Sequence, residues 1–492
     1  MRLWGDEMYK KRDRIQITFD EFIMPFGGKL KGDNRWVKLA EMIPWDFIED
    51  VYATKMSEES GAGAITARIA FGAIFIKENE NLQDRNTVEY IAENPYMQFF
   101  LGLKEFESEP LFDASMMVHF RKRFPADFIE EINKRMFVEM AKNDINQKDK
   151  NESEKVVHTY MDNSDDDNND SDTPENKGKL VLDATCAPAD VRYPSDLSLL
   201  NEARENTEEI IEKLWEHSKK QGHKTGYNRR KARKEFLKII KQKKPGIQKI
   251  RTVIKQQIHY VTSNIETIGR LLLEAKKEVL EQKHYDRIMT ICELLRQQQT
   301  MIENENHSVP NRIVSLRQPH IRPIVRGKAG RKVEFGQKLA FSVVGGYTFI
   351  EEQKYDNFNE GTGLIDSAKR YKERYGFYPE AIQADQIYRN RDNLAFCKEN
   401  NIRLSGPKLG RPAKNEEQNR EFEYKDNCER NIIEGRNGMA KRRFGLDLIM
   451  AYLPETGKTE AALQVLCMNV RIRILALFYR FLQLFVLKKI KT

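Results

Sequence analysis

Three acidic residues in different local contexts are the part of this sequence best suited to chemistry. Asp183 and Asp385 each end a short apolar run that predicts a strand, and Glu434 lies in a predicted helix ahead of the basic run 441–443. Carboxylates from two strand ends and one helix can share one or two Mg²⁺ ions, because hard cations take oxygen ligands and keep open positions for phosphate. The chain has a formal net charge of +8, so nucleic acid is the predicted substrate.

Two basic residues are predicted to share a helix face with Glu434. Arg430 precedes it by four residues and Lys441 follows it by seven, and both spacings return to the same side of a helix. An arginine and a lysine at these positions could hold phosphates beside the metal. The alternative is an ion-pair ladder on the surface of the helix.

Each acid also has a simpler interpretation. The two aspartates could be a turn residue and a helix cap, and the glutamate could lie on a solvated helix face. Asp392 is the rival of Asp385, and Glu429 is the rival of Glu434. The basic residues at fixed spacing around Glu434 favour the three acids acting together.

Several short motifs are spread along most of the chain. They are PFGGKL at 25–30, DNRWVKL at 33–39, ENPYMQFFLG at 93–102 and LDAT at 182–185. Arg430, Glu434 and Lys441 have the spacing R-x3-E-x6-K. Together these features resemble the DDE-type transposases of bacterial insertion sequences, in the group with a Tyr-Arg-Glu-Lys signature (insertion-sequence families 4 and 5). The chain departs from the signature at the tyrosine, where it has Asn427, and Tyr424 lies one helical turn earlier.

The resemblance implies a DNA transposase that cleaves transposon ends and joins the 3′-hydroxyl to target DNA. It assigns catalysis and metal binding to Asp183, Asp385 and Glu434, with Mg²⁺ as cofactor and Mn²⁺ as a substitute. Two metal ions can activate the nucleophile and stabilise the leaving oxygen of an in-line displacement. Water would attack first and the freed 3′-hydroxyl second. The expected partners are double-stranded DNA, as terminal repeats and target, and a second copy of the chain in the DNA complex.

Composition is consistent with a soluble protein in a reducing compartment. The 492 residues are 40% hydrophobic and 32% charged, and the five cysteines have no paired spacing that would indicate zinc or disulfides. The N-terminus lacks the apolar stretch of a signal peptide. Arg473 and Arg480 interrupt the apolar stretch 472–486, which predicts a packed helix and no membrane span. We therefore expect a cytoplasmic protein, and the resemblance to bacterial transposases implies association with the nucleoid.

The order of the predicted elements indicates an α/β protein with a ribonuclease-H-like mixed sheet, a long helical insertion after the first strand, and an N-terminal all-helical domain. The predicted parts are an N-terminal helical DNA-end-binding domain at 1–143, an acidic disordered linker at 144–178, a catalytic domain at 179–196 and 326–460, an inserted helical hairpin at 197–325, and a C-terminal helix at 461–492. A plain helical bundle is the alternative for the first part.

The predicted insertion combines an apolar seam with a basic patch. Apolar residues alternate at steps of three and four from 247 to 279, which predicts one arm of an antiparallel hairpin with a turn at 284–286. A dimerising coiled coil is the competing interpretation. Residues 219–255 hold about 15 Lys or Arg and almost no acid, a pattern typical of a nucleic-acid patch. The predicted DNA contacts are Arg229, Arg230, Lys231 and Arg233.

Two other functions fit much of the same pattern. A non-catalytic DNA-binding descendant, such as a repressor or a domesticated protein, would keep the basic surfaces but would tolerate the loss of an acid. A structure-specific nuclease on the same fold would cut without strand transfer. All three acids are present, which favours an enzyme.

Overall fold

The chain forms two compact units. The computed structural model describes residues 17–54, 56, 65–153, 176–218, 228–274, 279–325, 333–406 and 416–490, without the side chains of 147–153, 416–423 and 480–490. The first unit comprises Met1–Ala187, Lys338–Lys354 and Phe358–Thr492, and the second Pro188–Gln337 and Tyr355–Asn357. The predicted insertion lies within the second unit.

A mixed sheet forms the centre of the first unit, which confirms the predicted α/β class. Its strands are β1 (Lys179–Pro188), β3 (Val333–Val344), β4 (Tyr347–Lys354), β5 (Ala381–Gln383) and β6 (Arg403–Leu404), in the order β4–β3–β1–β5–β6. β3 and β4 pair antiparallel, whereas β1 with β5 and β5 with β6 pair parallel. Gly345 and Gly346 make the β3–β4 turn with φ of 56° and 83°, which a side chain would disfavour.

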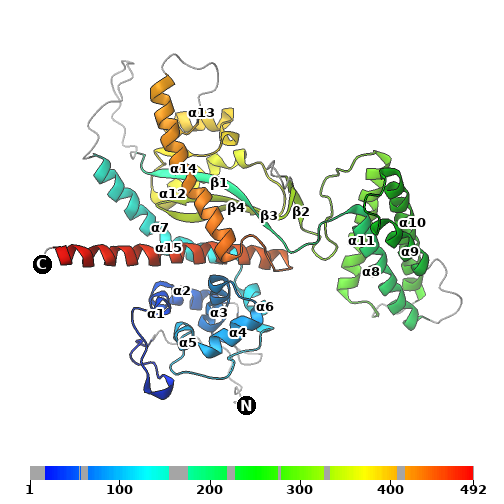
Figure 1. Ribbon diagram of the computed structural model, residues 1–492, viewed down its shortest axis with the longest axis horizontal. Coiled ribbons are helices and arrows are strands. Elements are labelled where there is room, and N and C mark those ends of the chain that lie inside the picture. The colour runs from blue at the N-terminus through cyan, green and yellow to red at the C-terminus, as the bar shows by residue number, and fades with distance from the viewer. Residues whose placement is uncertain are drawn as a thin grey trace. The chain divides into compact units, whose positions relative to one another are not determined.

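Long helices cover this sheet. They are α7 (Ala126–Ser153), α12 (Leu364–Tyr375), α13 (Arg391–Glu399), α14 (Glu416–Phe444) and α15 (Pro454–Ile490). α7 and α15 pack against β4, and α14 packs against β5 (Figure 1). Arg370 and Arg374 of α12 hold the buried carboxylate of Glu351 on β4, at 2.6 and 2.7 Å. The strands and helices thus share fixed contacts on which a site can be built.

The segment predicted as a linker at 144–178 is partly ordered. α7 continues to Ser153, and Ile145 is buried in the core. At the other end, the Lys177 N–H donates to the carbonyl of Tyr378 at 3.0 Å, and its carbonyl accepts from the Tyr371 hydroxyl at 2.7 Å. The acidic stretch 162–172 lies outside the described residues.

The N-terminal helices share a core with the sheet. They are α1 (Arg35–Met42), α2 (Trp45–Ala53), α3 (Ala67–Glu80), α4 (Asp84–Glu93), α5 (Pro95–Phe100) and α6 (Met116–Arg123). Asn34 and Thr66 cap α1 and α3 by accepting backbone N–H groups of the first turn. α3 is buried along most of its length and packs against α15. These helices therefore belong to the same compact unit as the catalytic part predicted from the sequence.

The C-terminal helix is longer than predicted, beginning at Pro454 and not at residue 461. By length and composition alone, its part from Pro454 to Tyr479 could cross a membrane. However, 56% of the most apolar 18-residue stretch in this part of the helix is buried, and this stretch includes the core residues Leu463, Leu466 and Met468. Packing against the first unit therefore accounts for the apolar composition of the described part of α15.

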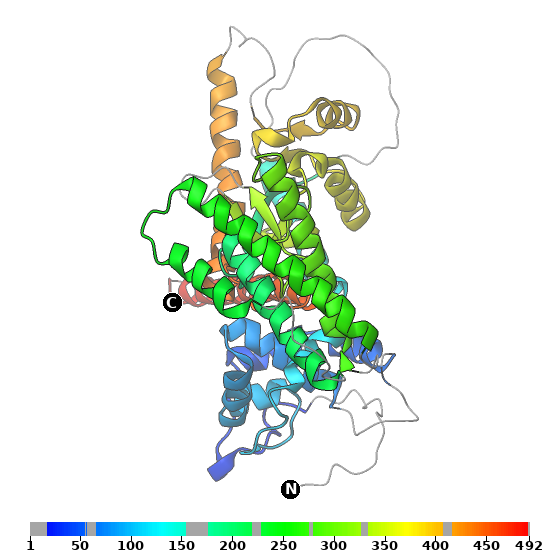
Figure 2. The same cartoon turned by 90° about the vertical axis from the view of Figure 1, so that its right-hand side faces the viewer.

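In the described residues of the second unit, four α-helices form a bundle. They are α8 (Asp196–His217), α9 (Arg229–Ile240), α10 (Ile247–Glu274) and α11 (Gln282–Glu303), and they run alongside one another as the green segments of Figure 2. Apart from the bundle, the short strand β2 (Arg322–Val325) pairs antiparallel with Val333–Gly336 of β3.

The middle of the apolar seam predicted for this region is buried inside the chain, whereas Ile247 at its start is 70% exposed. Ile258, Val261 and Ile268 of α10 lie in apolar clusters with residues of α8 and α11, and α8 is the most extensive partner of α10. The predicted two-helix hairpin is therefore part of a four-helix arrangement. The predicted turn at 284–286 is wrong, because α11 begins at Gln282 and His284 completes its N-terminal capping box.

Candidate active site and nucleic-acid interface

Asp183 lies inside β1 and not at its end. The strand continues to Pro188, and the residues after the acid, including Ala184, Cys186 and Ala187, are buried. The pairing of β1 with β5, however, stops at Val181, opposite Gln383. Asp183 is thus two residues beyond the point where the two strands separate. The sequence predicted that Asp183 is accessible because its strand ends there. In the structure, β1 continues, and Asp183 lies beyond the last residue of β1 that pairs with β5.

Asp385 lies level with Asp183. Parallel pairing places Val181 opposite Gln383, so two more residues along each strand lead to the two aspartates. Neighbouring strands are about 4.8 Å apart. The prediction that Asp385 ends the strand is wrong, because β5 ends two residues earlier, at Gln383. Instead, Asp385 caps the short helix η4 (Gln386–Tyr388) by accepting the Gln386 N–H at 2.7 Å, and its side chain is 64% exposed.

One face of α14 connects the three acids. The Nη1 of Arg430 lies 3.2 Å from Oδ1 of Asp385, and its Nη2 lies 3.9 Å from Oε1 of Glu434. One helical turn after Glu434, the Nδ2 of Asn437 donates to Oδ2 of Asp183 at 2.8 Å. The structure therefore brings Asp183, Asp385, Glu434 and Arg430 into one region. The sequence interpretation missed Asn437, although its spacing of three residues from Glu434 indicates the same helix face.

The rival acid Glu429 is engaged elsewhere. Its carboxylate pairs with the Lys179 ammonium at 2.9 Å and accepts a hydrogen bond from Gln383. Burial acts to raise the pKa of Glu429, but the hydrogen bonds from Lys179 and Gln383 outweigh it and lower the pKa below its usual value. Glu429 is thus a fixed anion that holds α14 to β1 and β5. Glu434 is 61% exposed and closer to the aspartates.

Other contacts of α14 fix its position along the sheet. Asp426 is buried and pairs with Arg403 of β6, at 2.8 Å from Nη2 to Oδ1. Near the other end, Arg436 donates to the carbonyl of Gly346 in the β3–β4 turn at 3.0 Å. These contacts join the helix to β6, in the parallel part of the sheet, and to the β3–β4 turn, in the antiparallel part. They determine which residues of α14 meet the aspartates.

Several carboxylates lie near the buried phenol of Tyr388. The pKa of Tyr388 is raised, first by burial of its hydroxyl and then by nearby carboxylates, among them Glu360, Asp183 and Asp385. Both aspartates thus act on a single phenol, which is consistent with their level positions on neighbouring strands. Carboxylates gathered in this way favour a bound cation.

The donor atoms suit a hard cation such as Mg²⁺. They are carboxylate oxygens from the strand β1, from the cap of η4 and from the helix α14, and Asn437 carries an amide oxygen. Among the described residues, no group of three His, Cys, Asp or Glu is close enough to hold a metal ion. The Arg430 guanidinium instead neutralises Asp385 and Glu434. The chemistry of the residues fits the predicted metal, and a cation already lies between two of the three acids.

The remaining positions of the predicted signature are only partly accounted for. Lys441 is half-buried in the last turn of α14, on the face that carries Arg430 and Glu434. Asn427, at the family tyrosine position, is exposed. Tyr424 is 73% exposed and lies on another side of the helix from Arg430 and Glu434.

The predicted basic patch lies on α9. Arg230, Lys231 and Arg233 are exposed and pair with no acid among the described residues of the chain. Arg229 differs, because its guanidinium lies 3.5 Å from Glu208 and 3.9 Å from Glu212 of α8. Arg229 thus fastens α9 to α8, whereas its three neighbours remain available for a phosphate backbone. Residues 219–227 of the basic block lie outside the described part.

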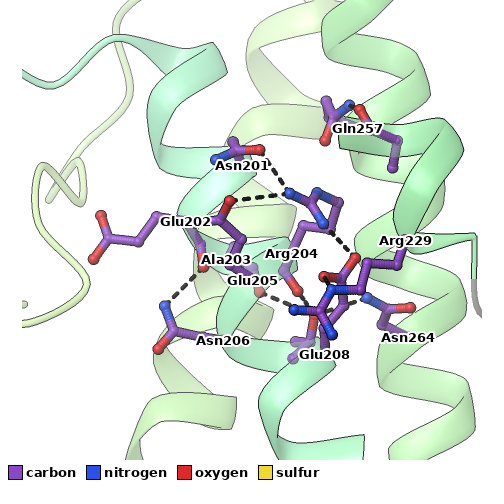
Figure 3. A network of polar contacts seen from close by, with 12 residues as sticks. Asn201, Glu202, Ala203, Arg204, Glu205, Asn206, Glu208, Arg229, Gln257 and Asn264 are labelled. Carbon is purple, nitrogen blue, oxygen red and sulfur yellow. Dashed lines mark hydrogen bonds and ion pairs between the residues drawn. The ribbon is translucent and has the colours of Figure 1, made fainter. Parts of the chain in front are cut away.

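A buried network of polar side chains from α8 and α10 packs against α9. The Arg204 guanidinium, 1% exposed, donates to Glu208 and, at 2.9 Å, to Asn201 (Figure 3). Nearby, Asn264 of α10 donates to Thr207 at 3.0 Å, and Gln257 of α10 donates to the carbonyl of Ala232 in α9 at 3.0 Å. Such a network specifies how the helices are matched, because a mispaired helix would leave buried charges without partners.

Comparisons with known proteins point in the same direction as the site. Residues 382–471 match the family described as "Transposase DDE domain", and residues 25–123 match the one described as "Transposase domain (DUF772)". The chain is 28% identical over 212 residues to "Uncharacterized protein ORF8 in nfe locus" of Rhizobium meliloti, a match that covers 43% of this chain and 83% of that protein. No solved structure matches the chain significantly.

These matches support a DDE-type insertion-sequence transposase. The first matched region contains Asp385, Arg430, Glu434, Asn437 and Lys441, whereas β1 with Asp183 lies outside both regions. Asp183 is connected to the matched region by the register of β1 with β5 and by its hydrogen bond from Asn437.

Proposed function

We propose that this chain is a DNA transposase that cleaves transposon ends and joins the 3′-hydroxyl to target DNA by two-metal-ion phosphodiester chemistry. The observation that carries the proposal is the double contact of α14 with the strand aspartates. Arg430 reaches Asp385 and Asn437 reaches Asp183, so Glu434 between them shares their site. The matched transposase regions at both ends of the chain support the same activity.

Asp183, Asp385 and Glu434 would hold Mg²⁺, or Mn²⁺ in its place. The bound ions would activate the attacking oxygen and stabilise the leaving oxygen of the phosphodiester. The chain's own part is to fix the carboxylates and to neutralise phosphate charge with Arg430 and Lys441. Water is the first nucleophile and the freed 3′-hydroxyl the second, so no covalent enzyme intermediate is required.

We further propose a ribonuclease-H-like catalytic domain of the Tyr-Arg-Glu-Lys group. The succession of β1, the β3–β4 hairpin, α12, β5, α13, β6 and α14, with helices inserted after β1, supports this fold. The spacing of Arg430, Glu434 and Lys441 supports the group, and Asn427 departs from it.

The proposed partner is double-stranded DNA, as element ends and as target. Arg230, Lys231 and Arg233 are exposed, which supports contact of α9 with the phosphate backbone of DNA. Such contacts would not depend on the DNA sequence. The N-terminal helices are the proposed end-binding part. A homodimer in the DNA complex and a cytoplasmic, nucleoid-associated location belong to the same proposal.

Cleavage and strand transfer on DNA that carries the element's ends test the proposal. Asp183→Asn, Asp385→Asn and Glu434→Gln are each expected to lower cleavage by several orders of magnitude and to leave DNA affinity nearly unchanged, because each removes one metal ligand. Asp392→Asn is the matched control and is expected to retain activity. Full cleavage by any of the three variants would remove that residue from the site. Cleavage without joining would indicate a nuclease.

A further inference from the structure

Asn437 of α14 contacts Asp183 directly. Its Nδ2 lies 2.8 Å from Oδ2 of Asp183. The carboxylate determines which end of the amide faces it, because an ionised carboxylate only accepts hydrogen bonds and therefore requires the N–H end. The amide oxygen of Asn437 consequently points away from Asp183.

Within the part of the chain that the structure describes, that oxygen accepts no hydrogen bond. Oδ1 of Asn437 is also buried. Asn469, a buried asparagine of α15, has both ends of its amide in use. Its Nδ2 donates to Asn133 and to the carbonyl of Thr348, and its Oδ1 accepts the Thr348 N–H at 2.9 Å. A buried oxygen without a partner is unfavourable unless a ligand or an ion completes it.

Asn437 itself lies among the residues of the acid site, because its position in the sequence returns it to the same face of α14. Arg430, Glu434 and Lys441 share its face of α14, and Asp385 contacts Arg430. Amide oxygens are ordinary ligands of hard divalent cations, alongside carboxylates.

We propose that Asn437 completes the acid site: its N–H holds the Asp183 carboxylate in one orientation, and its Oδ1 is a further oxygen for the divalent cation bound there. This inference rests on the proposed function. Asn437 thereby acts as a positioning residue for Asp183 and as a fourth donor beside the three acids.

Binding of Mn²⁺ to the full-length protein, titrated by electron paramagnetic resonance, tests this role without any DNA substrate. Asn437→Ala removes both ends of the amide and is expected to weaken Mn²⁺ binding by about tenfold or more, as the loss of an outer-shell partner does. Asn437→Asp keeps an oxygen but loses the N–H donor. Its affinity is expected to be close to wild type at pH 8 and to fall steeply towards pH 5, because two facing carboxylates compete for protons.

The control is Asn431→Ala, an exposed asparagine on another side of the same helix, which is expected to bind Mn²⁺ with wild-type affinity. Wild-type affinity in Asn437→Ala, in a series where Asp183→Asn weakens binding, would overturn the role of Asn437 alone. Wild-type affinity in Asp183→Asn would overturn the proposed acid site itself. If Asn437→Ala does not fold, an Asn437→Asp variant without the pH effect would also overturn the inference.

Discussion

The acid site and the helical bundle place their charged residues in opposite ways. At the acid site, Asp385 and Glu434 are more than 60% exposed, and they are brought together by strand register and by contacts from α14. In the bundle, the charges that define the structure, Arg204 and Glu208, are buried, and the charges available for binding lie outside them on α9. The comparison shows that the buried charges form a platform, meaning that they fix how the helices pack. The exposed charges, which are positioned by contacts from several elements, form the site.

The largest effect on stability is expected from the buried network. Arg204→Ala leaves Glu208 buried without its main partner, and such a loss costs about 3–5 kcal/mol. Urea unfolding of the full chain, followed on the transition of the bundle, measures the change. Arg296→Ala, which breaks the exposed pair with Glu293, is the matched control and is expected to cost under about 1 kcal/mol. Equal costs for both variants would contradict the platform role of Arg204.

The next effect concerns DNA affinity. Changing Arg230, Lys231 and Arg233 to Glu together is expected to weaken binding to all sequences alike. It is also expected to reduce the slope of log affinity against log salt by up to about 3, one for each lost phosphate contact. Fluorescence anisotropy at several salt concentrations measures both. Lys283→Glu and Arg296→Glu on α11, combined with Lys369→Glu on α12, reverse the same number of exposed charges and control for net charge. A changed sequence preference with an unchanged slope would contradict backbone contact.

Arg229 sharpens the comparison within one helix. Because it pairs with Glu208 and Glu212, Arg229→Ala is expected to affect the stability of the bundle more than DNA affinity. The sequence interpretation grouped it with its three neighbours, since a run of basic residues does not reveal which member is paired. An affinity loss in Arg229→Ala as large as that of the triple variant would return it to the DNA-binding set.

A smaller and more selective effect is expected at Arg430. Its guanidinium neutralises Asp385 and Glu434 without being a metal ligand, so Arg430→Ala is expected to keep Mn²⁺ binding. Cleavage or joining is expected to fall about 10- to 100-fold, the value of a hydrogen bond to a charged group. Arg430→Lys is expected to restore only part of the activity, because an ammonium cannot form the planar fork. Wild-type rates in both variants would reduce the row on α14 to a surface ion-pair ladder.

The sequence predicted local features better than their partners. Alternating and apolar runs indicated the β3–β4 hairpin, and the spacing of Arg430, Glu434 and Lys441 indicated one helix face. The period of α10 indicated a buried seam, but a period does not say what covers it, and α8 proved to be the main partner. His284 marked a helix start where a turn was predicted, because the same residue types favour both.

The site was predicted in its acids but not in its geometry. Asp183 was expected at a strand end, and the structure places it where β1 leaves β5, which depends on a pairing between residues about 200 positions apart. Asn437 was missed for a related reason. The role of an asparagine on a helix cannot be predicted until the strand that it faces is known.

The most direct test of the central claim is the position of Mn²⁺ in crystals of this protein, located by anomalous scattering. The account predicts a peak about 2.0–2.6 Å from a carboxylate oxygen of Asp183 and from one of Asp385 or Glu434. It also predicts that the Arg430 guanidinium moves away from at least one of its two acids. A peak held elsewhere, for example by Asp426 and Glu429, with Asp183 and Asp385 free of metal, would contradict it.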